Sequence, residues 1–189
     1  MIFTSVLWTA DPSYYSIAID AAGTATYQSA PDSIERTGAP YMVEFQVSDR
    51  TRRTAFNVTR QLDYFPERTD ESITSAQNAS IRTLGYHDSQ FHNQITLSSS
   101  SDAEIEELAS VFEEISETLE FGRRLAYFHK NDNSSLEPEL DRVQTNADRR
   151  ILREFSNIAP ILRSIVSDNR LESAPRHKAE AILNGQPRH

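Results

Sequence analysis

Residues 15–27 have the pattern of a β-hairpin, and this pattern constrains the fold more than any other in the chain. Ile17 and Ile19 alternate with small or polar residues, which is the period-two pattern of a strand with one buried face. Asp20 and Gly23 follow, and they supply the side-chain hydrogen bond and the positive φ of a short reversal. The chain is therefore expected to contain an antiparallel strand pair near its start.

More strands and a helix are expected after this hairpin. Residues 41–47 alternate between apolar and polar side chains and predict a third strand. Ser48 is a suitable N-cap, and apolar residues at helical spacing predict a helix that stops before Pro66. Residues 67–79 are polar and without a period, so a loop is expected before a second hairpin over residues 83–97.

The strongest helical pattern begins at Ser101. The sequence Ser101-Asp102-Ala103-Glu104 fits a capping box. Apolar residues then recur every three or four positions, at Ile105, Leu108, Phe112, Ile115 and Leu119. This spacing predicts one long amphipathic helix that ends near Asn131.

The remaining residues have helical patterns only. A third helix is expected to turn Leu140, Val143, Ala147, Ile151, Phe155 and Ile158 inward. Pro160 forces a kink or a new helix start. A last short helix is expected near residues 175–183, with its end at Asn184-Gly185.

Strand pairs joined through helices predict an α+β fold. We expect a largely antiparallel sheet of about five strands with helices packed on one face, followed by C-terminal helices. The expected parts are an N-terminal tail or edge strand (1–13), an α+β domain (14–131) and a C-terminal helical extension (132–189). The apolar start also fits the remainder of an export signal that begins upstream. Export or a periplasmic location would follow in that case, and a cytoplasmic location otherwise.

Composition excludes several classes of protein. A formal net charge of −9 disfavours nucleic acid, so the expected partner is a protein, with a homo-oligomer as an alternative. The chain contains no cysteine, which excludes disulfides and thiolate chemistry. No apolar run approaches the ~18–20 residues of a transmembrane helix. The five glycines are too scattered for a phosphate-binding loop, and no cofactor is expected.

The second hairpin contains the nearest approach to a catalytic or metal site. His87, Asp88 and His92 lie near its turn, and two imidazoles beside a carboxylate can hold a metal ion or transfer a proton. A turn at residues 88–89 is the favoured register, and it places the imidazoles diagonally, about 7–8 Å apart. A turn at residues 89–90 places them face to face, at about 5 Å. The alternative to a site is a set of polar residues on the solvent face of a hairpin.

The long helix contains a second candidate. Gly122 costs a helix about 1 kcal/mol relative to alanine, which is explained if the helix packs closely against another backbone there. The alternative is a recognition surface formed by Phe121, Arg123 and Arg124, since aromatic and arginine side chains are common at binding hot spots.

Three segments resemble an uncharacterised group of bacterial domains of unknown function. They are Tyr15-Ser16-Ile17-Ala18-Ile19-Asp20 with Gly23 and Tyr27, Thr83-Leu84-Gly85-Tyr86-His87-Asp88, and Thr118-Leu119-Glu120-Phe121-Gly122-Arg123-Arg124-Leu125. The resemblance covers about residues 15–130 and part of the C-terminal helices. No activity, cofactor or catalytic residue is known for the group, so the resemblance implies none, while the frequent export of its members favours the export interpretation. Ser89 departs from the glycine that similar chains have in the second turn.

Three functions are compatible with these patterns. The leading hypothesis is a non-catalytic binding or protein-interaction domain, envelope-associated if exported, which uses its exposed sheet face or the helix around residues 121–125. The second is a metal-dependent or hydrolase-like enzyme centred on His87 and His92. The third is a structural oligomerisation module, in which another subunit covers Ile151, Phe155, Ile158 and Leu162.

Overall fold

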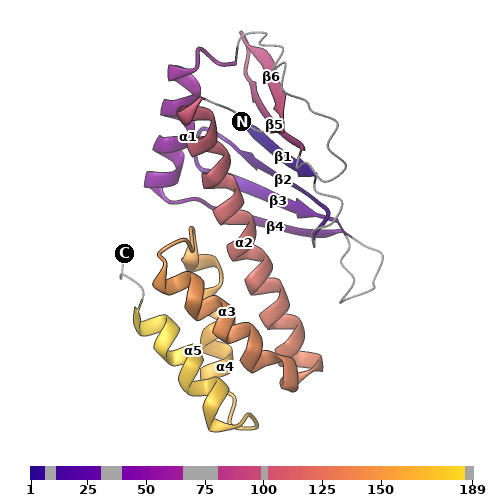
Figure 1. The fold of residues 1–189 in the computed structure, drawn as a ribbon, viewed down its shortest axis with the longest axis vertical. Coiled ribbons are helices and arrows are strands. Elements are labelled where there is room, and N and C mark those ends of the chain that lie inside the picture. Colours follow the sequence, from indigo (N-terminus) through magenta and orange to yellow (C-terminus); the bar gives the residue numbers. More distant parts are fainter. Residues whose placement is uncertain (7–11, 31–39, 66–80, 99–101, 186–189) are drawn as a thin grey trace. The chain divides into compact units, whose positions relative to one another are not determined.

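The computed structural model describes residues 1–6, 12–30, 40–65, 81–98 and 102–185. Within these residues the chain forms one six-stranded antiparallel sheet and the helices α1 to α5 (Figure 1). This is the predicted α+β architecture, with slightly more strands than expected. The chain divides into two units, Met1–Glu113 and Glu114–His189, and the boundary falls within α2 (Ala103–Asn131) rather than at its end.

The strands are arranged in the order β4-β3-β2-β1-β5-β6. Their bounds are Ile2–Val6 for β1, Tyr14–Ile19 for β2, Thr24–Ser29 for β3, Tyr41–Gln46 for β4, Ile81–His87 for β5 and His92–Leu97 for β6. β1 pairs with β2 on one side and with β5 on the other, so it is an interior strand. The expectation of a tail or an edge strand over residues 1–13 is therefore wrong for residues 2–6.

The β2–β3 hairpin has the predicted turn chemistry. The Asp20 carboxylate accepts a hydrogen bond from Thr24 N at 2.9 Å. Gly23 has a φ of 92°, which lies in the region that other residues rarely adopt. Ile17 and Ile19 are buried on one face of β2, as their alternation predicts.

One row of side chains crosses the whole sheet on its covered face. From β4 to β6, the pairing registers align Val43, Tyr27, Ile17, Phe3, Leu84 and Ile95. The Phe3 ring stacks on Phe112 of α2, with centroids 4.9 Å apart and an interplanar angle of 2°. Thr59 of α1 (Asp49–Gln61) lies with its Oγ1 3.4 Å from Met1 Sδ. The core of unit 1 therefore lies between the sheet and two helices on one face, as predicted.

A partly buried ion pair joins β5 to α2 on this covered face. Arg82 is 7% exposed, and its guanidinium donates to both carboxylate oxygens of Glu106, at 2.9 and 2.8 Å. Glu113 lies 3.6 Å from the same guanidinium. Two parallel hydrogen bonds between arginine and a carboxylate fix an orientation as well as a distance, so the pair sets where α2 crosses β5. Sequence analysis did not identify this pair, since no local pattern connects the two elements.

Helix α1 begins as predicted and ends earlier. The Ser48 hydroxyl accepts a hydrogen bond from Thr51 N at 3.2 Å, which is the expected N-cap. The helix ends at Gln61 instead of continuing toward Pro66, because Asp63 adopts a left-handed φ of 51° and closes the last turn.

Helix α2 has the predicted length and inward face. The predicted inward residues are all buried, namely Ile105, Leu108, Phe112, Ile115 and Leu119. The Asp102 carboxylate accepts a hydrogen bond from Glu104 N at 3.1 Å at the start of the helix. Ser101 of the predicted capping box and the predicted loop over residues 67–79 lie outside the described residues.

Unit 2 contains the rest of α2 and the helices α3 (Leu136–Asp148), α4 (Ala159–Ser167) and α5 (Ser173–Gly185). Its core consists of Phe121, Leu125, Leu136, Leu140, Val143, Ile158, Leu162, Ile165, Leu171, Ala179 and Ile182. The new helix start at Pro160 and the helix end at Gly185 are confirmed. None of the helices described here combines the length and the apolar character that crossing a bilayer requires.

The prediction of one helix that continues to Ile158 is wrong, because α3 stops at a left-handed residue. Arg150 has a φ of 60°, and its N–H donates to Ala147 O at 3.0 Å. Ile151 N donates to Asn146 O at 3.2 Å. Together these bonds form the Schellman arrangement, in which glycine usually occupies the left-handed position.

Replacement of Arg150 by glycine should therefore stabilise the protein. A left-handed non-glycine residue costs about 1–2 kcal/mol, and the freedom of glycine in the unfolded chain offsets about 0.5–1 kcal/mol of this. We expect Arg150→Gly to raise the free energy of unfolding by roughly 0.5–1 kcal/mol in urea denaturation. The matched control is Arg149→Gly, where φ is −77° and glycine should destabilise. Equal effects of the two substitutions would contradict the strain argument.

Gly122 marks a close contact between α2 and the start of α4. A Cβ at this position would lie 2.6 Å from Ile158 Cγ2 and 3.4 Å from Ile158 Cβ. The first separation is far shorter than van der Waals contact, and the second lies at its lower limit. Close packing at Gly122 is confirmed, but its near neighbour is the side chain of Ile158 and not a backbone as expected.

Gly122→Ala should destabilise unit 2 although alanine is the better helix former. Overpacking a core costs about 1–3 kcal/mol, which exceeds the ~1 kcal/mol that alanine contributes to the helix. The expected result is a net loss in thermal and chemical denaturation. Gly185→Ala is the control, since a Cβ there would have no atom within 4 Å. A Gly122→Ala variant as stable as the parent protein would show that displacing Ile158 costs no more than the ~1 kcal/mol that alanine contributes to the helix.

Candidate functional site

The tip of the β5–β6 hairpin is held together by the Asp88 carboxylate. Its Oδ1 accepts hydrogen bonds from Gln90 N at 2.7 Å and from Phe91 N at 2.8 Å. Its Oδ2 accepts a third from the Tyr86 hydroxyl at 2.9 Å. The two backbone bonds and the Tyr86 bond lower the pKa of Asp88, while burial and then the Asp88 carboxylate raise the pKa of Tyr86. Asp88 therefore acts as a structural anchor of the turn.

The register that follows brings the two histidines together. Asp88 N also donates to Phe91 O at 2.9 Å, so the loop is Ser89-Gln90 and His87 lies directly opposite His92. The favoured register, with the turn at residues 88–89 and diagonal imidazoles, is therefore wrong, and the face-to-face alternative is the one observed. The physical reason is that Asp88 precedes the two turn residues. From there its carboxylate accepts hydrogen bonds from the backbone N–H groups of Gln90 and Phe91.

The two imidazoles are in direct contact on the exposed face of the hairpin. The Nδ1 atoms of His87 and His92 are 2.6 Å apart, and the ring centroids are 3.8 Å apart at an interplanar angle of 81°. At this distance one Nδ1 can donate a hydrogen bond to the other, and the tautomers of the two rings set which one donates. The hairpin thus presents two ring nitrogens at one point of its surface.

The opposite side of the tip is braced by a strained turn that follows α1. Asp63, Tyr64 and Phe65 all have left-handed φ values, of 51°, 58° and 60°. The Tyr64 ring stacks on Phe91 with centroids 4.4 Å apart. The Tyr64 carbonyl accepts a hydrogen bond from Asn93 Nδ2 at 3.0 Å. Such a backbone costs about 1–2 kcal/mol per residue, so these contacts must offset a considerable strain.

No group of three or more histidine, aspartate and glutamate side chains that could hold a metal ion occurs in the part of the chain that the structure describes. Asp88, the third member of the predicted set, has both oxygens engaged in the turn. His87 and His92 alone remain as donors at the tip. The arrangement supports two-point binding through nitrogen and offers no built acid–base triad.

The second predicted site lies in the interior. Phe121 and Arg123 are 3% and 5% exposed, and Phe121 belongs to the core of unit 2. Arg123 pairs with Glu120 at 2.6 Å. Arg124 lies over the Phe121 ring and donates through Nε to Glu139 at 2.6 Å. The proposed recognition surface is corrected accordingly, since these side chains stabilise the fold from within.

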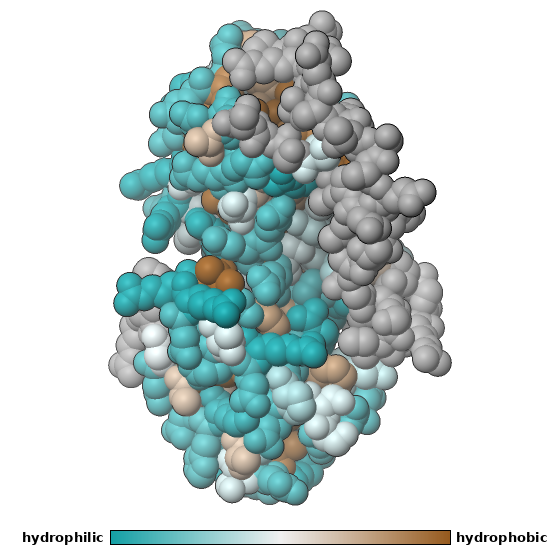
Figure 2. Space-filling model, viewed as in Figure 1, coloured by the Kyte–Doolittle hydropathy of each residue, from teal (hydrophilic) through white to brown (hydrophobic). Residues whose placement is uncertain are grey.

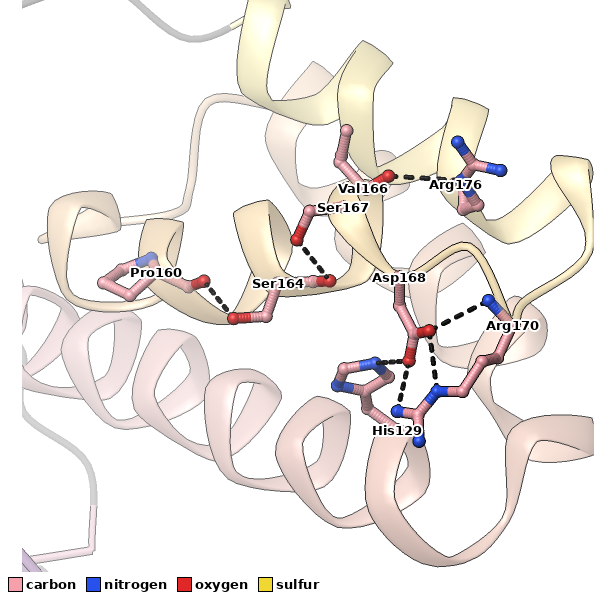
Figure 3. Close-up of polar contacts among 8 residues, drawn as sticks. All are labelled: His129, Pro160, Ser164, Val166, Ser167, Asp168, Arg170 and Arg176. Carbon is pink, nitrogen blue, oxygen red and sulfur yellow. Dashed lines mark hydrogen bonds and ion pairs between the residues drawn. The ribbon is translucent and has the colours of Figure 1, made fainter.

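A polar cluster that sequence analysis missed joins the end of α2 to the turn after α4 (Figure 3). Asp168 Oδ2 lies 3.0 Å from His129 Nε2 and 2.7 Å from Arg170 Nη2. The Arg170 guanidinium is the main reason that the pKa of Asp168 lies well below its usual range. The neighbouring Ser164 and Ser167 hydroxyls donate to carbonyls of α4 itself. The role of the cluster is therefore structural: it links the end of α2 to the turn after α4.

No protein-family model matches this chain, and no curated protein or solved structure is significantly similar to it. The resemblance to the uncharacterised bacterial group stays a prediction.

Protonation of Asp88 should weaken the hairpin at low pH. The folded-state pKa of Asp88 lies below the ordinary value of about 3.9, so its stabilisation is complete above that value and is lost as the pH falls toward the folded-state pKa. Asp88→Asn keeps an oxygen acceptor and removes the titrating group. We therefore expect the parent protein to lose more stability than Asp88→Asn between pH 7 and about pH 2.5 in urea denaturation.

The other aspartates with lowered pKa values, Asp132 and Asp168, are present in both proteins. Their contribution to acid sensitivity therefore cancels in the comparison. An identical loss in the two proteins would mean that Asp88 does not couple protonation to folding.

Proposed function

We propose that this protein is a non-catalytic interaction module that docks a partner protein on the sheet face opposite α1 and α2, which no described helix covers and which is here called the outer face. The single observation that supports the proposal is the near absence of charge on this face. Its described members are Thr4, Tyr14, Ser16, Ala18, Thr24, Thr26, Gln28, Met42, Glu44, Gln46, Ile81, Thr83, Gly85, His87, His92, Gln94 and Thr96. Glu44 is the only acidic residue among them, and none is lysine or arginine.

This composition contrasts with the rest of the protein. A quarter of all residues are charged, and hydrophilic residues dominate the surface of the described residues in Figure 2. The centres of protein–protein interfaces are depleted of lysine, glutamate and aspartate. Met42 and Ile81 add apolar side chains that are 60% and 38% exposed. A face that avoids charge although it is exposed is typical of a surface that another protein covers.

The proposed occupant is a different protein with a neutral or basic face. Two copies of a chain with a net charge of −9 repel each other before their faces meet. A neutral or basic partner meets no such barrier. The alternative of oligomerisation through the C-terminal helices is less well supported, because Ile158 and Leu162 belong to the unit's own core and Phe155 packs against it.

The enzyme hypothesis is likewise less well supported than docking. It requires a third ligand or an acid–base partner beside His87 and His92, and Asp88 is engaged in the turn. The histidine pair lies at one end of the outer face.

A charge placed on the outer face should abolish docking. Thr26→Lys adds an ammonium group at an exposed position of β3, and Gln61→Lys adds the same group at an exposed position of α1 as the matched control. Both full-length variants should fold, which circular dichroism and thermal melts will check. Photo-crosslinkers at position 26 should capture a partner from a cell extract, whereas crosslinkers at position 61 should not. Thr26→Lys should lose the partner, and Gln61→Lys should retain it.

Equal partner recovery by both lysine variants, or crosslinks confined to the helices, would overturn the proposal. Light scattering on the purified protein tests the alternative occupant of the outer face, a second copy of this chain. A dimer that dissociates in Thr26→Lys would identify a second copy as the partner and refute the choice of a different protein.

A further inference from the structure

We propose that His87 and His92 form a two-nitrogen site for a divalent ion that prefers square-planar coordination, Cu²⁺ above Ni²⁺. The geometry of the hairpin tip alone supports the site, so it stands without the docking function, although both histidines belong to the outer face. Its ligands are the two Nδ1 atoms, which lie 2.6 Å apart on the exposed face of the hairpin.

The separation of these atoms selects the class of metal. With metal–nitrogen bonds of about 2.0–2.1 Å, two neighbouring ligands at 90° lie about 2.9 Å apart, and two ligands at the tetrahedral angle lie about 3.3 Å apart. The observed Nδ1–Nδ1 distance is 2.6 Å. The two nitrogens must separate by about 0.3 Å to reach the square-planar distance and by about 0.7 Å to reach the tetrahedral one. In both cases the exposed rings also turn from facing each other to facing the ion. Imidazole also binds Cu²⁺ more tightly than the other divalent ions of its row.

The backbone that carries the two ligands is already in place. The Asp88 turn sets His87 opposite His92, and the stacking of Tyr64 on Phe91 braces the same tip from its other side. A site whose ligands are held before binding avoids much of the entropic cost of ordering them. Asp88 is thus a positioning residue for the site and does not bind the ion.

Binding requires a proton rearrangement that the exposed rings permit. One imidazole carries its proton on Nδ1 in the present pair, and coordination by both Nδ1 atoms moves that proton to Nε2 through solvent. Both rings then bind as neutral ligands. Water occupies the other coordination positions, or a donor group of a docked protein replaces it.

Titration of the full-length protein with Cu²⁺ alone tests the site. We expect one saturable ion per chain by calorimetry in a weakly coordinating buffer, and two nitrogen ligands in the electron paramagnetic resonance spectrum. His87→Gln and His92→Gln should each lower the affinity at least about tenfold, since loss of second-shell support alone costs 10–100-fold at metal sites. Ni²⁺ should bind more weakly than Cu²⁺, and Zn²⁺ more weakly again.

His177→Gln is the matched control, because it removes another exposed histidine and should leave the affinity unchanged. Asp88→Ala should weaken binding by releasing the turn, and Asp88→Asn should restore most of it. Unchanged Cu²⁺ affinity in His92→Gln, a spectrum with one nitrogen ligand, or tighter binding of Zn²⁺ than of Cu²⁺ would overturn the proposal.

Discussion

The sheet depends on the pairing of its first strand with two partners. β1 bonds to β2 along one edge and to β5 along the other, and it is the strand through which the β2–β3–β4 and β5–β6 parts become one sheet. Phe3 at its centre is fully buried and stacks on Phe112 of α2. Both the hydrogen bonding of the sheet and the packing of its helix layer therefore converge on five residues at the start of the chain.

Local patterns in the sequence predicted the elements whose causes are themselves local. Asp20 and Gly23 specify a turn, Ser48 an N-cap, and the spacing from Ile105 to Leu119 a helix, and the structure contains all three. The interior place of β1 was not predictable in this way. A short apolar segment looks alike at an edge and at the centre of a sheet, and the choice depends on strands far along the chain. The end of α3 was missed because arginine occupies a position that glycine normally marks.

The candidate site illustrates the same division. His87, Asp88 and His92 are predictable as a group, because these residue types lie beside one predicted turn. The register predicted from turn preferences was wrong, because these preferences reflect backbone angles. They do not include the hydrogen bonds that the Asp88 carboxylate accepts from the turn. The stacking of Tyr64 on Phe91 could not be predicted, because three successive left-handed residues without glycine have no recognisable sequence pattern. The structure of the hairpin tip therefore depends on side-chain contacts between distant segments, which local propensity does not describe.

The position of Glu44 has a consequence for self-association. β4 is an outer strand of the sheet, and the backbone groups of such a strand can hydrogen-bond a strand from another molecule, which is a route to fibrous aggregates. Glu44 projects from the middle of β4, and any incoming strand would have to place its own side chains beside this carboxylate. In two identical chains joined in register along β4, the carboxylates would repel. Glu44, the one acidic residue among the described members of the outer face, thus disfavours growth of the sheet along β4.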